Sequence, residues 1–392
     1  MALTLPVNTR IESIDLLKGL VMVLMALDHV RDYFHYSSFF FDPSDPLQTT
    51  LPIFFTRWIT HFCAPTFSFL AGVSAYMASK RRTHNELSSF LLKRGIWLIF
   101  VELTIVGFAW SFNVDFSSFG LRVIWSLGIS MIFLSALIHL PRIAILIFSL
   151  LLVCCHNLFD NVHYADNFWW DIVHEQMVYQ LTDSTQLVIG YPIVPWIAIM
   201  ALGYYFGGFY APTYDASKRI KIFNYIGGIA IAVFVLLRLT NLYGDSKPFI
   251  QFDTFSQSLI SFLNPTKYPP SFLYILMTLG LSFLFLANTE KLKGKVVDYF
   301  CTFGRAPFFY YILHLYIIHL LALIFAELSG FGWQKMILST WVGFETNLKG
   351  YGFDLWVVYV VWIGVILMLY PLCKKFDGYK RAHKEKWWLS YL

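Results

Sequence analysis

The sequence is poor in charged residues. Only 14% of its 392 residues are Asp, Glu, Lys or Arg, whereas soluble globular chains carry about 25%. Hydrophobic residues make up 57% and aromatic residues 19%, so the folded chain cannot cover itself with groups that water solvates. This composition excludes a soluble globular protein and predicts an integral membrane protein surrounded by a lipid bilayer. The net charge of +5 therefore does not indicate a nucleic-acid partner.

The sequence also lacks the short motifs of several kinds of site. Its five cysteines show none of the spacings of zinc sites, and no pair of histidines has the short helical spacing that binds zinc. It contains no P-loop, no dinucleotide-binding glycine pattern, no internal repeat and no low-complexity linker. We therefore expect no metal ion and a single membrane domain over residues 1–392.

Long apolar runs, by contrast, recur along the whole chain. Each can reach the roughly 20 residues with which a helix crosses a hydrocarbon core. We predict an all-α, polytopic membrane protein with about ten transmembrane helices, at residues 14–35, 52–79, 89–110, 121–140, 142–159, 190–210, 222–241, 269–288, 307–327 and 354–375. Pro141 forces the turn between the fourth and fifth helices.

Basic residues are unevenly distributed among the segments that connect these helices. If the N-terminus is cytoplasmic, the cytoplasmic segments hold 20 of the 29 Lys and Arg residues. The long segment after helix five, on the other side, is acidic. Segments rich in Lys and Arg stay in the cytoplasm, so the distribution predicts that both termini are cytoplasmic.

Ionisable residues interrupt the outer part of the first helix. Asp28, Arg31, Asp32 and His35 follow i, i+3, i+4, i+7 spacing and share one helix face. Asp28 and the adjacent His29 point about 100° apart on a helix, so we expect each to face the cavity from a different edge or to pair across to helix two or helix nine. Ionisable groups inside a membrane span are costly and usually mark a site or a pathway.

Three further helices carry polar residues inside the predicted spans. In helix two, Pro65 cannot donate a backbone hydrogen bond to the carbonyl of His61, so we predict a kink and a new partner for that carbonyl. Helix nine carries His314 and His319, and at least one of them must face protein. Glu102 in helix three needs an Arg or His partner or a neutral form. We expect a central cavity walled by helices one, two, three and nine.

Several segments in order carry a resemblance. "RIESIDLLKGLVMVLMALDHVRDYF", "HFCAPTFSFLAGVSAYM", "LKRGIWLIFVELTIVGF" and "LRVIWSLGISMIF" together resemble the catalytic membrane domain of the heparan-α-glucosaminide N-acetyltransferase family. "LNPTKYPPSFLYILMTLG", "FGRAPFFYYILHLYIIHLLA" and the ending "KWWLSYL" resemble its bacterial branch. The resemblance covers nearly the whole chain, and the order of the segments makes it specific.

The resemblance implies transfer of an acetyl group from cytosolic acetyl-CoA to an amine or hydroxyl of a sugar or glycan on the extracytoplasmic side of a bacterial inner membrane. Asp28 lies where the animal enzyme has an active-site Asn, and His29 or His35 lies close to its catalytic His. That His belongs to the outside loop after helix one, whereas residues 37–60 here contain no histidine. The sequence leaves open which histidine takes the role.

Acyl transfer needs a base for the attacking group, donors for the developing oxyanion and cations for the CoA phosphates. We expect the base and its orienting groups among Asp28, His29, His35 and His61. The residues expected to bind the acceptor or the oxyanion are Arg31, Glu102, Arg122, Tyr310, His314 and His319. The residues expected to hold CoA on the cytoplasmic side are Lys80, Arg81, Arg82, Lys93 and Arg94.

The competing class is a proton-coupled transporter that uses Asp28, His61, Glu102 and His314 as a relay. Such transporters are marked by paired repeats with Gly- or Pro-broken helices at matching positions, and Pro65 has no counterpart half a chain later. The sequence therefore favours the acetyltransferase, with acetyl-CoA and a carbohydrate acceptor as partners. It leaves open the identity of the acceptor, N- or O-acetylation, and a homodimer.

Overall fold

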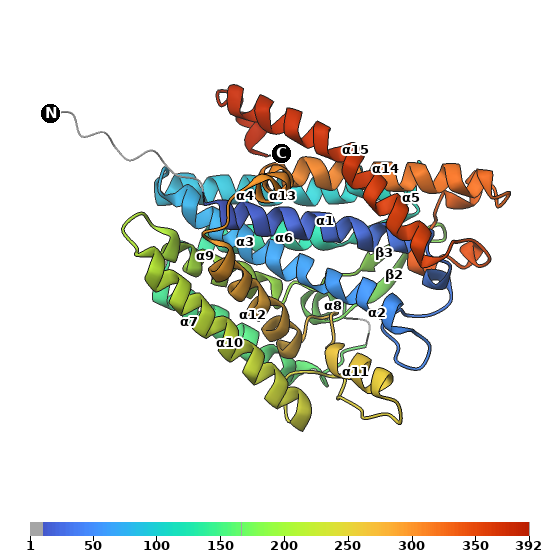
Figure 1. The fold of residues 1–392 in the computed structure, drawn as a ribbon, viewed down its shortest axis with the longest axis horizontal. Helices are drawn as coiled ribbons and strands as arrows, with labels where there is room; N and C mark the ends of the chain where they lie inside the picture. The colour runs from blue at the N-terminus through green and yellow to red at the C-terminus, as the bar shows by residue number, and fades with distance from the viewer. Residues whose placement is uncertain (1–10, 166, 392) are drawn as a thin grey trace.

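The computed structural model describes residues 11–165 and 167–391 and is a bundle of helices (Figure 1). Each of the ten predicted ranges contains a helix. The helices are α1 (Glu12–Phe34), α2 and α3 (Leu51–Trp58, Cys63–Ser79), α4 and α5 (His84–Val101, Gly107–Ser111), α6 (Val123–Leu137), α7 (Arg142–Cys155), α9 (Trp196–Gly207), α10 (Ala216–Thr240), α12 (Phe272–Thr289), α14 (Pro307–Leu328) and α15 (Leu355–Ala382). Residues 1–10, whose cytoplasmic location we predicted, lie outside the described residues.

Six helical segments in the described part of the chain are long and apolar enough to cross a membrane. They are Leu51–Ser79, Arg142–Phe159, Ala216–Thr240, Phe272–Thr289, Pro307–Leu328 and Leu355–Ala382. Helices α6 and α9 are shorter, with 15 and 12 residues, and α1 and α4 carry more charged side chains. The count of ten spans and the cytoplasmic termini remain predictions.

Helix α1 lies in the middle of the bundle (Figure 1). It packs against α3, α12, α13 (Lys295–Arg305), α14 and α15, and most of its residues are buried. A helix surrounded in this way presents its polar side chains to protein rather than to lipid. The charged residues of α1 must therefore find their partners on neighbouring helices.

Glycines allow α3 and α9 to approach backbone to backbone. A Cβ added to Gly203 would lie 2.0 Å from the carbonyl oxygen of Phe69, and one added to Gly72 would lie 1.9 Å from that of Met200. Small residues permit this kind of close contact between membrane helices. Helix α9, which is buried on almost every side, is thereby fixed against α3.

The α-helix is interrupted between α2 and α3, as Pro65 predicts. A 3₁₀ turn, η2 (Ile59–Phe62), separates the two helices. The carbonyl of His61 accepts a hydrogen bond of 2.6 Å from the hydroxyl of Tyr274 in α12. The predicted kink and the predicted new partner for this carbonyl are both confirmed. The predicted third helix (residues 89–110) is interrupted too, because η3 (Glu102–Val106), a π-helical turn, joins α4 to α5.

A small sheet lies toward the end of the bundle at which α1 ends (Figure 1). Its strands, β1 (Ser118–Leu121), β2 (Met177–Thr182) and β3 (Thr185–Ile189), have the order β1-β3-β2, with β1 parallel and β2 antiparallel to β3. The all-α expectation holds for the bundle but misses this sheet, because its strands are short and β2 is largely exposed. Strand β1 ends directly before Arg122 and the start of α6.

The contact between α3 and α9 predicts a difference between two glycine substitutions. Gly203→Ala places a methyl group against a backbone carbonyl and should lower the free energy of unfolding by about 1–3 kcal/mol. Gly228→Ala in α10 is the matched control, because a Cβ there meets no atom within 4 Å, and it should leave stability unchanged or slightly raised. Thermal unfolding of both variants in detergent tests this, and equal melting temperatures would contradict it.

Candidate active site

Two histidines from distant parts of the chain form the centre of the candidate site. Nδ1 of His29 in α1 lies 2.7 Å from Nε2 of His314 in α14, and the two ring planes are within 16° of parallel with their centroids 4.9 Å apart. The other ring nitrogen of His314, Nδ1, lies 3.0 Å from the carbonyl oxygen of Tyr310. His314 is fully buried, whereas His29 is half-buried. His29 is therefore the member of the pair that a substrate can reach.

Aromatic rings hold this histidine pair in place. Trp110 of α5 meets His29 edge-on, with the ring centroids 4.8 Å apart. Tyr310 stacks on His314 at 5.2 Å, and Tyr311 meets the same ring edge-on at 5.5 Å. Rotation of either imidazole would break these contacts, so the surroundings favour one orientation of the pair.

Asp28 pairs with arginines rather than with His29. Its Oδ2 lies 2.5 Å from Nη1 of Arg57 in α2, and its Oδ1 lies 3.0 Å from Nη2 of Arg31. Arg31 also contacts Asp32 at 2.5 Å. Of the alternatives that the sequence left open, pairing across is the one observed: Asp28 pairs with helix two and His29 with helix nine. Asp28 therefore fixes the positions of arginines and does not orient His29.

The two other candidate bases have different surroundings. The backbone of His35 is extended (φ −88°, ψ 124°), and its Nδ1 lies 2.5 Å from Oγ of Ser37. His35 has thus left the helix and does not share a face with Asp28 and Arg31, which corrects the expectation from spacing. His61 is buried, and its Nδ1 has no hydrogen-bond partner among residues 11–165 and 167–391.

Glu102 and Arg122 form an ion pair that holds the start of α6. Oε1 of Glu102 lies 3.6 Å from Nη1 of Arg122. Oε2 accepts hydrogen bonds from the backbone N–H groups of Ile124 (3.1 Å) and Trp125 (3.3 Å). The guanidinium of Arg122 lies over the ring of Trp110 at 5.6 Å. The expected Arg partner of Glu102 is confirmed, and the pair supports the tryptophan that touches His29.

His319, which we expected to bind the acceptor, has its ring nitrogens against backbone. Nδ1 lies 2.9 Å from the carbonyl oxygen of Ala109, and Nε2 lies 2.8 Å from that of Met336. The side chain is fully buried. These contacts connect α14 to α5 and to the 3₁₀ turn η6 (Trp333–Met336), so the visible role of His319 is structural.

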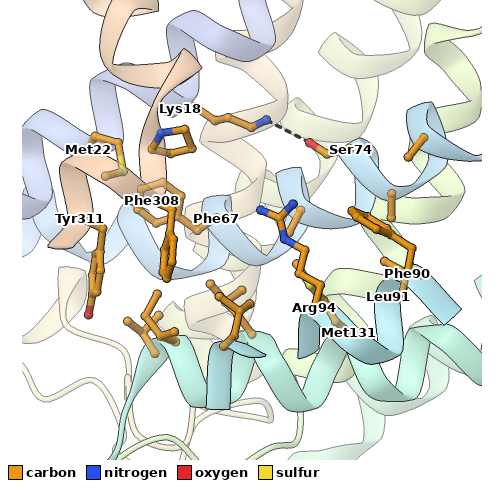
Figure 2. A pocket seen from close by; sticks show the side chains of 18 of the residues that line it. Lys18, Met22, Phe67, Ser74, Phe90, Leu91, Arg94, Met131, Phe308 and Tyr311 are labelled. Carbon is orange, nitrogen blue, oxygen red and sulfur yellow. Dashed lines mark hydrogen bonds between the residues drawn. The ribbon is translucent and has the colours of Figure 1, made fainter. Parts of the chain in front are cut away.

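A cavity of about 260 Å³ lies between α1, α3, α4, α6 and α14 (Figure 2). Its lining is mostly apolar, with Lys18, Ser74, Arg94 and Tyr311 as polar exceptions. The ammonium of Lys18 donates a hydrogen bond of 2.9 Å to Oγ of Ser74, and Figure 2 shows Arg94 extending from α4 into the same region. The expected walls from helices one, two, three and nine are confirmed, and α6 is an additional wall.

The cavity leads along α1 toward the histidine pair. Lys18, Met22 and Met25 line it, and i, i+4, i+7, i+11 spacing places His29 on the same helix face. On α14, the lining residue Tyr311 contacts the ring of the buried histidine one turn later. The cations of the cavity and the histidine pair thus lie at opposite ends of one row of side chains.

Of the five cations expected to hold CoA, only Arg94 lines this cavity. The guanidinium of Arg82 lies over the ring of Phe90, itself a lining residue, at 4.4 Å. The remaining three are exposed, namely Lys80, Arg81 and Lys93. No three His, Cys, Asp or Glu side chains in the described part of the chain gather as a metal site.

Three residues of the site were missed by sequence reasoning: Lys18, Arg57 and Trp110. A signal existed for Lys18, because it falls on the His29 face of α1 at helical spacing. Arg57 was a lone cation in an apolar segment, which is the pattern of a partner for Asp28. Trp110 had no such signal, since it follows the π-helical turn η3, which breaks the helical periodicity.

A comparison with protein families finds a match. The family model described as "Heparan-alpha-glucosaminide N-acetyltransferase, catalytic" matches residues 10–238. The chain belongs to this family. No curated protein matches the sequence. The match includes α1, α3, α4 and α6, and α14 with His314 lies beyond it. Together, the family and the six apolar helices identify an integral membrane protein of a membrane acetyltransferase family.

The pair of Asp28 and Arg57 in this family member predicts coupled effects on stability. Both side chains are largely buried, at 13% and 16% exposure, so removing one charge leaves the other without its partner. Asp28→Asn and Arg57→Leu should each lower the free energy of unfolding. The loss in the double variant should be smaller than the sum of the two single losses by about 0.5–3 kcal/mol. Denaturant unfolding in detergent measures this coupling, and strictly additive effects would show that the pair contributes nothing.

Proposed function

We propose that this protein moves an acetyl group from cytosolic acetyl-CoA to an amine or hydroxyl of a sugar or glycan on the extracytoplasmic side of a bacterial inner membrane. The observation that carries the proposal is the cavity lined by Lys18 and Arg94 and, along α1, by Met22 and Met25, the last of which lies one helical turn before His29. This row of side chains connects a binding region for a cytosolic donor with a base deep in the bundle. Membership in the acetyltransferase family supports the reaction class.

The cavity suits the chemistry of acetyl-CoA. Its uncharged, flexible pantetheine arm fits a narrow and mostly apolar space, whereas its phosphates need cations. Lys18 and Arg94 supply two cations on the lining itself. An arm that extends from these cations along the Met22 and Met25 face would bring the thioester toward His29.

His29 is the proposed general base. Its imidazole takes a proton from the attacking amine or hydroxyl as that group bonds to the thioester carbonyl carbon. The C–S bond then breaks, and the proton passes from His29 to the departing thiolate, which leaves as CoA. Tyr311 is the polar side chain of the lining nearest to the histidine pair in sequence, and we assign its hydroxyl to the developing oxyanion.

The acceptor approaches from the opposite end of α1. Asp28, Arg31, Asp32 and Arg57 form a charged cluster beside His29 on that side. A hydroxyl-rich or amine-bearing sugar is a suitable ligand for such a mixture of carboxylates and guanidinium groups, because it both donates and accepts hydrogen bonds.

The contacts of the ionisable groups argue against the transporter. A proton relay would need Asp28, His61, Glu102 and His314 to follow one another. Instead, Asp28 contacts two arginines, Glu102 holds Arg122 and the start of α6, and His314 contacts His29. These residues belong to separate clusters, which favours the enzyme.

Replacement of Arg94 tests the donor site. Arg94→Leu should raise the Kd for acetyl-CoA by about 10- to 100-fold, as expected for loss of a hydrogen bond between charged groups, and added salt should reduce the difference. Lys93→Met removes a neighbouring positive charge that is exposed and outside the cavity, so it is the matched control. Isothermal titration compares them, and equal effects of the two substitutions would refute the donor assignment.

Transfer from labelled acetyl-CoA to a panel of amino sugars and polyols, with purified protein in liposomes, tests the reaction itself. His29→Ala should lower kcat by about 10²- to 10⁴-fold with little change in acetyl-CoA affinity. Asp28→Asn should be milder, because it keeps the hydrogen-bonding ability and loses only charge. Flux of the same sugars is measured in parallel. Flux without acetylation would favour the transporter, and a fully active His29→Ala would exclude His29 as the base.

A further inference from the structure

We propose that His314 is a positioning residue that holds His29 in the tautomer whose Nε2 carries the lone pair. This inference rests on the proposed function, in which His29 is the base. It adds a second residue to the site, from a helix that lies outside the segment matched by the family model.

The first step concerns the proton of His314. Its Nδ1 lies 3.0 Å from the carbonyl oxygen of Tyr310, and a carbonyl oxygen can only accept a hydrogen bond. Nδ1 of His314 therefore carries the proton. A neutral imidazole has one N–H group, so Nε2 of His314 presents a lone pair.

The second step concerns the proton of His29. Its Nδ1 lies 2.7 Å from Nε2 of His314, so Nδ1 of His29 must donate to that lone pair. The single proton of a neutral His29 is thereby placed on Nδ1. Its Nε2 is left unprotonated and available to take a proton, which is the state that a general base needs.

The third step concerns the charge that forms during the reaction. When His29 takes a proton at Nε2, it becomes an imidazolium, and its Nδ1–H continues to donate to Nε2 of His314. No proton needs to move to His314. The ring planes lie within 16° of each other and the centroids are 4.9 Å apart, so the rings meet edge to edge and the in-plane N–H points at the acceptor.

Burial separates the roles of the two histidines. His314 is fully buried and lies between His29 and Tyr310, so it acts through His29. Asp28 cannot replace it, because both of its oxygens face arginines. The orienting group is therefore a neutral imidazole, where hydrolytic triads use a carboxylate.

Two substitutions of His314 separate positioning from packing. His314→Gln keeps an acceptor near the position of Nε2 but cannot take up a proton, and its kcat should stay within about 10-fold of the wild type. His314→Leu removes the acceptor and should lower kcat by about 10²-fold or more. The Kd for acetyl-CoA should not change in either variant, which also shows that both are folded.

The control is Tyr316→Phe, which removes a different hydrogen bond from the same helix, the one donated to the carbonyl of Ile105. Its kcat should not change. A fully active His314→Leu variant would show that His314 contributes only packing and does not position His29. If the Gln variant falls as far as the Leu variant, His314 itself carries the proton, and the positioning role is wrong.

A readout without activity keeps this inference separate from the proposed function. The ¹⁵N shifts of the His29 ring, in protein labelled at histidine, should show a protonated Nδ1 and an unprotonated Nε2, and His314→Leu should shift this balance. If the wild type transfers no acetyl group but shows this tautomer, the function fails and the positioning stands. The opposite tautomer in the wild type would overturn the positioning.

Discussion

A charged side chain inside an apolar bundle persists only where a partner meets it, and this requirement determines what surrounds α1. The carboxylate of Asp28 needs Arg57, which ties α2 to the C-terminal part of α1. The ammonium of Lys18 contacts Ser74, which ties α3 to the N-terminal part of α1. One residue beyond Asp28, His29 contacts His314 of α14. The polar groups of α1, which are costly to bury in a membrane without partners, thus determine which helices pack against it.

Helix α3 uses small residues for two opposite purposes. Gly72 allows the backbone of α9 to approach so closely that no side chain fits between them. On another face, Ala71, Ser74, Ala75 and Ala78 are too short to reach across to α4 and α6, and the cavity occupies the space that they leave. Tight packing on one side holds the helix rigid, so the space on the other side does not collapse.

Periodicity predicted the helices but not their partners. The ten helical ranges, the kink before Pro65 and the pairing of Asp28 across to a neighbouring helix follow from local rules of spacing and hydrogen bonding. The pair of His29 and His314 joins residues 285 positions apart, and no local rule identifies which of several histidines meets which. The sheet was missed because its strands are only four to six residues long and β2 is largely exposed. His35 was misplaced because the helix ends one residue before it.

The π-helical turn η3 changes the phase of the helix that contains it. Eight residues separate Glu102 from Trp110, and in an uninterrupted α-helix they would point about 80° apart. A π turn absorbs one extra residue, which reduces the difference to about 20°. Both side chains consequently meet the same guanidinium, that of Arg122, while the tryptophan edge touches His29. One additional residue in this helix thus rotates Trp110 so that it and the Glu102 carboxylate contact the same arginine, which connects the carboxylate to the ring that touches His29.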